Sequence, residues 1–140
     1  MIPETVLLKL LLVVAAIGQL FVAALNLRLE KILGWKEDLA ALPPLMREVF
    51  VVHKWFISIT LIIFSLFTLR FSGELISGEE VAARWIAGSI AAFWTIRAVI
   101  QWCYYGKQHW KGKLRETTVH WILTIVYGGW SLLYGWCSIR

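Results

Sequence analysis

Charged residues are scarce in this 140-residue chain. They make up 16% of it, against roughly 25% in ordinary soluble domains. Apolar residues make up 59%, and the mean hydropathy is +0.69. A short chain buries only part of its surface when it folds, so it cannot hide this much apolar surface within itself. These values exclude a water-soluble domain and predict a protein whose apolar surface faces lipid.

Cysteine is also rare, since only Cys103 and Cys137 occur. We expect them at opposite faces of the membrane, where a disulfide between them is not feasible. The sequence contains no Cys-x-x-Cys pair and no Cys/His spacing of the kind that binds zinc. This cysteine content argues against quinone-linked thiol oxidoreductases, which need a pair of thiols.

Four apolar runs are long enough to cross a bilayer, which takes about 20 residues. They cover about residues 6–27, 49–71, 81–105 and 119–137. The first run is longer than the apolar core of a signal peptide, so we expect it to be a retained helix. The runs leave no room for a separate soluble domain. The sequence therefore predicts an all-α integral membrane protein, with residues 1–140 forming one membrane domain as an up-down bundle of four transmembrane helices.

Basic residues cluster in the first and third loops between these runs. They are Arg28, Lys31, Lys36 and Arg47 in the first loop, and Lys107, Lys111, Lys113 and Arg115 in the third. The second loop instead carries Glu74, Glu79 and Glu80. By the positive-inside rule, we expect a bacterial inner membrane protein with both termini on the non-cytoplasmic side. The charges are too few for nucleic-acid binding and suit attraction to anionic lipid.

The first loop has a pattern of its own over about residues 28–41. Apolar residues recur there near helical spacing, and charged residues fill the other face. This pattern is typical of a short helix lying in the membrane interface. Gly34 weakens the helix, and Pro43 with Pro44 ends it. We expect the segment to connect the first two spans and to cover one end of the bundle.

Acidic residues are absent from all four runs, although the third run carries Arg84 near its start and Arg97 well inside it. Arg97 and Gln101 are four residues apart and therefore share one helix face. The sequence leaves several partners open for Arg97: backbone carbonyls, water, Gln101, an acid at a helix end such as Glu48 or Glu116, a lipid phosphate, a fatty-acid carboxylate, a haem propionate, or an acid of another subunit. Ionisable residues inside a membrane are functional candidates by default.

His53 and His120 occupy matching places at the starts of the second and fourth runs, in REVFVVHKW and RETTVHW. We expect them at similar depth on two helices that lie diagonally in an up-down bundle. Two facing imidazoles could ligate the iron of haem b while Arg97 pairs with a propionate. With Gln101, the same residues could bind a quinone. Simple hydrogen bonding at the interface is the alternative for both histidines, and the third histidine, His109, lies in a basic loop.

Three functions follow from these residues. The first is a non-catalytic accessory or assembly subunit of a larger membrane complex, which contacts the bilayer and other membrane subunits or copies of itself. The second is the binding of haem b or quinone by His53, His120, Arg97 and Gln101. The third is a lipid- or isoprenoid-modifying enzyme in which Arg97 holds a phosphate and a histidine acts as acid or base. Small drug antiporters are disfavoured because they need a glutamate within the membrane.

Overall fold

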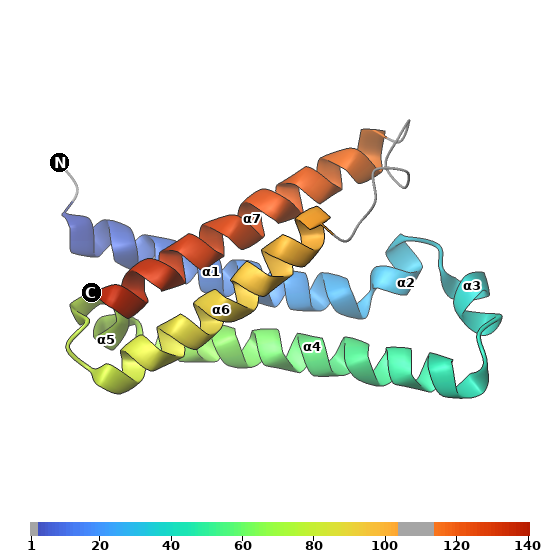
Figure 1. Cartoon of the computed structure of the whole chain (residues 1–140), viewed down its shortest axis with the longest axis horizontal. Coiled ribbons are helices and arrows are strands. Elements are labelled where there is room, and N and C mark those ends of the chain that lie inside the picture. Colours follow the sequence, from blue (N-terminus) through green and yellow to red (C-terminus); the bar gives the residue numbers. More distant parts are fainter. Residues whose placement is uncertain (1–2, 104–113) are drawn as a thin grey trace. The chain divides into compact units, whose positions relative to one another are not determined.

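The computed structural model of the chain describes residues 3–103 and 114–140, and all regular structure in these two ranges is helical. Four helices are long and apolar enough to cross a membrane (Figure 1). They are α1 (Glu4–Leu27), α4 (Pro44–Arg70), α6 (Val81–Cys103) and α7 (Leu114–Ile139). The predicted all-α membrane protein with four spanning helices is thereby confirmed.

The helices begin and end close to the predicted spans. α4 begins earlier than predicted because Pro44 suits the first turn of a helix, where its missing N–H has no partner to lose. α7 also begins early, at Leu114. The predicted end of the third span at residues 104–105 lies outside the described residues. The same holds for His109 and for the third-loop lysines Lys107, Lys111 and Lys113.

Short helices connect the long ones. The predicted interfacial segment over residues 28–41 is divided into α2 (Leu29–Ile32) and α3 (Lys36–Ala40). Gly34 lies between them with a φ of 70°, a left-handed conformation that favours glycine and ends a helix. A further short helix, α5 (Ser72–Ser77), was not predicted, and it ends at Gly78 in the same conformation.

The chain divides into two compact units, and the first comprises Leu10–Arg70. Within it, α1 and α4 run antiparallel and meet through small residues. Ser65 Oγ donates a hydrogen bond to the Ala16 carbonyl at 2.9 Å, and Ser58 Oγ donates to the Ala23 carbonyl at 3.2 Å. Ser58 and Ser65 are one heptad apart, and so are Ala16 and Ala23. The same contact therefore repeats along one face of each helix. Small residues let membrane helices approach closely.

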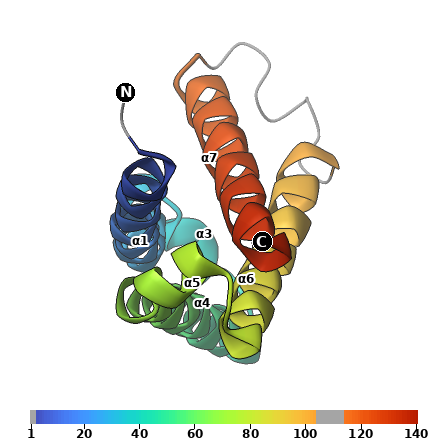
Figure 2. The ribbon, with the colours of Figure 1, turned by 90° about the vertical axis from the view of Figure 1, so that its left-hand side faces the viewer.

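The second unit comprises Met1–Lys9 and Phe71–Arg140, and it includes α5, α6 and α7. α6 and α7 lie side by side (Figures 1 and 2). Trp94 of α6 is 1% exposed. Its ring stacks on Tyr127 at a centroid distance of 5.0 Å and meets Trp130 edge-on at 4.5 Å. Near the other end of the pair, Arg84 Nε donates to the Ser138 carbonyl at 3.3 Å.

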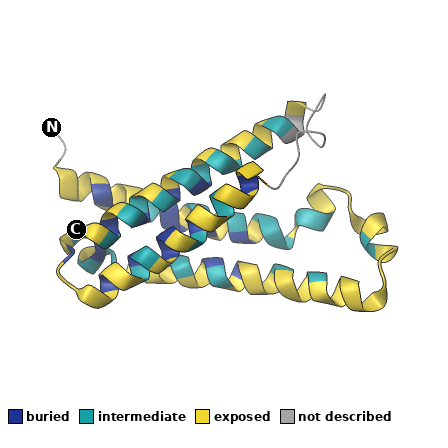
Figure 3. Cartoon of the chain, in the orientation of Figure 1, coloured by how far each residue is buried: buried dark blue, intermediate teal, exposed yellow. Residues whose placement is uncertain are grey.

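Exposed residues lie along all four long helices (Figure 3), and many of them carry large apolar side chains. The extreme case is α4, where only 17% of its most apolar window is buried. A soluble protein rarely exposes apolar patches of this extent, because water makes them unfavourable. A bilayer removes that penalty. The exposed surface is therefore what an integral membrane protein requires.

Candidate functional site

A chain of hydrogen bonds joins α6 to α7. Arg97 Nη1 donates to Gln101 Oε1 at 2.9 Å, and Gln101 Nε2 lies 2.9 Å from His120 Nδ1. The spacing of four residues on α6 brings the first two side chains together, as predicted. α7 supplies His120. The structure thus joins three of the four residues that the sequence analysis selected.

Burial and stacking hold the arginine in place. Gln101 is 3% exposed, while Arg97 and His120 are half-buried. The guanidinium of Arg97 lies over the ring of Tyr127, 4.9 Å from its centroid, and Trp94 stacks on the same ring. A cation over an aromatic face is stabilised by about 2 kcal/mol when both are shielded from water. Gln101 and Tyr127 therefore fix the position of the charge although neither is charged.

The direction of the hydrogen bonds determines the tautomer of His120. A guanidinium can only donate, so Arg97 must face the amide oxygen of Gln101. The amide NH₂ then faces the ring and donates to His120 Nδ1. That nitrogen accepts, so in the neutral imidazole the proton lies on Nε2.

This tautomer defines the chemistry that the site offers. The remaining polar atoms of Arg97 are N–H donors, and His120 presents Nε2–H as a further donor. A ligand at either end of the chain must therefore supply an acceptor, such as a carboxylate, a phosphate or a quinone carbonyl. Ligation of haem iron through His120 Nε2 would require that nitrogen to lose its proton and the Gln101 amide to turn.

His53, the fourth selected residue, lies on α4 in the first unit. Its side chain is exposed, and Nδ1 is 3.1 Å from the Val49 carbonyl one turn earlier. A carbonyl only accepts, so Nδ1 carries the proton and Nε2 presents a lone pair. The two histidines belong to different units, and the pairing of His53 with His120 on one haem stays a prediction. No group of three or more His, Cys, Asp or Glu able to hold a metal ion occurs among the described residues.

A second polar cluster joins α2 to the α1–α4 pair. Lys54 Nζ forms an ion pair of 2.9 Å with Glu30 Oε1, and the lysine side chain is only 9% exposed. Asn26 Nδ2 donates to the Lys54 carbonyl at 2.9 Å and to Ser58 Oγ at 3.0 Å. Sequence reasoning did not assign these residues to a site. Asn26 and Lys54 were visible as polar residues within apolar runs, but nothing in the sequence pointed to Glu30 as the partner.

Fold and site together define the class: an all-helical integral membrane protein with four spanning helices and an ordered arginine within one of them. Comparison with known proteins adds no narrower identity. No protein-family model, curated protein or solved structure matches the chain.

Proposed function

We propose that the protein is a non-catalytic accessory or assembly subunit of a larger membrane complex, and that Arg97 binds an acidic group of a neighbouring subunit. The observation that carries this proposal is the placement of the guanidinium by two uncharged groups, the amide of Gln101 and the ring of Tyr127. Both restrict the side chain to one position on α6.

An arginine is costly within a bilayer, even after it moves its charged end toward the interface. We therefore expect the charge of Arg97 to have a function. An ordered guanidinium loses less side-chain entropy when it binds, and its N–H donors match both oxygens of a carboxylate. An acid on a partner helix is therefore a good match for Arg97.

The same proposal includes an orientation. The basic residues of the first and third loops would lie in the cytoplasm of a bacterial cell, and both termini would lie across the inner membrane from them. The helix end that bears Gln101 would then face the cytoplasm. The partner's acid would lie in the cytoplasmic half of the bilayer.

Site-specific crosslinking tests the proposal. A photo-reactive residue at Ile100, which is 41% exposed and lies one helical turn beyond Arg97, should capture a transmembrane segment that contains Asp or Glu. Arg97→Gln should abolish this crosslink, and Arg97→Lys should weaken it. Arg84→Gln is the matched control, because Arg84 lies on the same helix and binds the Ser138 carbonyl instead. Equal crosslinking in the two glutamine variants would disprove the role of Arg97.

Quinone binding is the second candidate, and the tautomer of His120 favours it over haem. A donor at Nε2 suits a quinone carbonyl. Organic extraction of the purified protein would reveal a bound quinone. An absorption spectrum, oxidised and dithionite-reduced, tests haem b independently. A Soret band that His53→Ala and His120→Ala each abolish would establish the haem site instead.

A further inference from the structure

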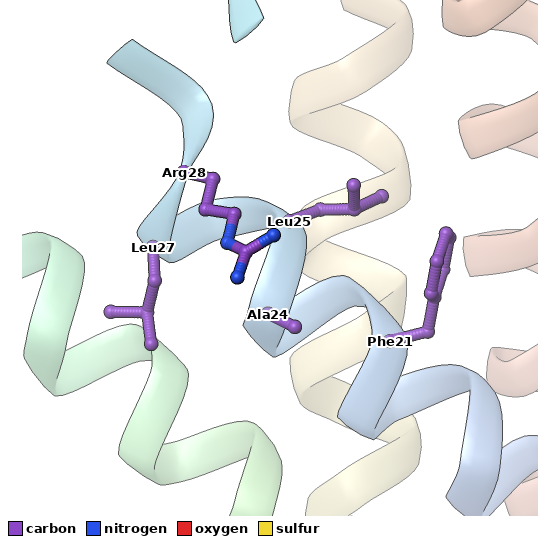
Figure 4. A pocket seen from close by; sticks show the side chains of 5 residues that line it. All are labelled: Phe21, Ala24, Leu25, Leu27 and Arg28. Atoms are coloured by element: carbon purple, nitrogen blue, oxygen red, sulfur yellow. The ribbon is translucent and has the colours of Figure 1, made fainter. Parts of the chain in front are cut away.

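A hollow lies on the side of α1 near its last turn (Figure 4). Its volume is about 380 Å³, and its lining residues are Phe21, Ala24, Leu25, Leu27 and Arg28. The first four are apolar, and the arginine follows the last residue of the helix. The hollow therefore has an aliphatic and aromatic wall with one cation at its end.

The backbone at Arg28 is held from both sides. The Arg28 amide donates to the Leu25 carbonyl at 3.0 Å, and the Arg28 carbonyl accepts from the amides of Lys31 and Ile32 at 3.0 Å. The ion pair between Glu30 and Lys54 ties the following helix, α2, to α4. The backbone that carries the Arg28 side chain is therefore held in place.

The side chain of Arg28 turns back along α1 toward Ala24 (Figure 4). This is the usual direction of a long side chain at the end of a helix. The Arg28 side chain is exposed. Its guanidinium forms no hydrogen bond or ion pair within residues 3–103 and 114–140. The positive charge next to the apolar wall is therefore uncompensated by the described part of the chain.

We infer that this hollow binds an anionic phospholipid, with one acyl chain against Phe21, Ala24 and Leu25 and the phosphate on Arg28. The sequence changes from apolar to charged at Arg28, which places the guanidinium at the depth where lipid phosphates lie. A guanidinium fork matches phosphate oxygens. The apolar wall explains why the occupant must also carry a hydrocarbon chain. This binding site is independent of Arg97 and of its proposed partner.

Native mass spectrometry of the detergent-purified chain, supplied with equal phosphatidylglycerol and phosphatidylcholine, tests the inference. The unsubstituted protein should retain one phosphatidylglycerol in preference to phosphatidylcholine. Arg28→Gln should reduce that retention about ten-fold or more, because hydrogen bonds to charged groups contribute on this scale. The matched control is Lys31→Gln, which removes an exposed charge from the same loop without touching the hollow and should change retention less than about two-fold.

A second pair of variants tests the apolar wall. Ala24→Leu fills the hollow and should lower the retention of both lipids. Val14→Leu enlarges an exposed side chain elsewhere on α1 and should lower neither. Both substitutions place an apolar side chain toward lipid, so both proteins should fold. Equal losses in Arg28→Gln and Lys31→Gln would overturn the inference. So would full retention in Ala24→Leu, or a bound mass belonging to a free fatty acid.

Discussion

Gln101 donates a hydrogen bond of 2.9 Å from its amide to Nδ1 of His120, and this bond crosses from α6 to α7. The amide has this orientation because Arg97 occupies its oxygen. The orientation that Arg97 imposes on the Gln101 amide therefore determines which ring nitrogen of His120 carries the proton.

Replacing this glutamine should destabilise the α6–α7 pair. Gln101→Leu keeps the size of the side chain but leaves a guanidinium N–H and an imidazole nitrogen without their common partner. We expect a loss of about 1–2 kcal/mol, since interhelical hydrogen bonds in membranes contribute modestly and an orphaned polar group adds its own cost. Equilibrium unfolding in mixed micelles measures it. Thr118→Val is the control because that hydroxyl binds only the Leu114 carbonyl of its own helix. Equal losses would contradict the bridging role.

The close contact between α1 and α4 predicts that a larger side chain at Ser65 destabilises the protein. Ser65 is fully buried and lies close enough to α1 to donate to the Ala16 carbonyl. Ser65→Val adds volume where the helices touch and should cost about 1–3 kcal/mol of unfolding free energy, whereas Ser65→Ala should cost about 0.6 kcal/mol for the lost hydrogen bond.

Ser89→Val is the matched control for this substitution. The Ser89 side chain is exposed, and its hydroxyl binds only the Trp85 carbonyl on its own helix. The same change there should be nearly neutral. The close contact between α1 and α4 would be wrong if Ser65→Val and Ser89→Val unfolded at the same denaturant concentration.

Much of the fold could be predicted because its signals are local. Each spanning helix is an apolar run of sufficient length, and the contact between Arg97 and Gln101 follows from their spacing on one helix. His120 could be named only as a candidate, because its partner depends on how α6 packs on α7. The pairing of Glu30 with Lys54 is likewise a tertiary contact. α5 was missed because SGELIS is short and only weakly periodic.

The ion pair between Glu30 and Lys54 should hold α2 in place. Glu30→Gln removes the charge that faces the nearly buried ammonium of Lys54. We expect the free energy needed to open the segment that contains α2 to fall by about 1–2 kcal/mol. Limited trypsin digestion at Lys31 and Lys36 should then be faster. Glu37→Gln changes an exposed acid of the neighbouring helix α3 and should leave the cleavage rate unchanged. If both variants were cleaved alike, the ion pair would not restrain the loop.

Three glycines should respond differently to alanine, because their surroundings differ. Gly78 has a φ of 69°, and a Cβ there would lie 2.9 Å from Arg140 Cβ and 3.1 Å from the Arg140 backbone. Gly78→Ala combines left-handed strain with a clash and should cost about 2–4 kcal/mol. Gly34 has the same conformation with open space around it, so Gly34→Ala should cost only about 1 kcal/mol.

The substitution of Gly73 tests helix propensity alone, without left-handed strain or a clash. It lies within α5, where a Cβ meets nothing within 4 Å, so Gly73→Ala should be neutral or stabilising by up to about 1 kcal/mol. Equilibrium unfolding of the three variants in the same micelles should rank Gly78→Ala as the least stable and Gly73→Ala as the most stable. If Gly78→Ala and Gly34→Ala lost equal stability, the clash with Arg140 would be absent. The end of α7 would then not rest on the Gly78 turn.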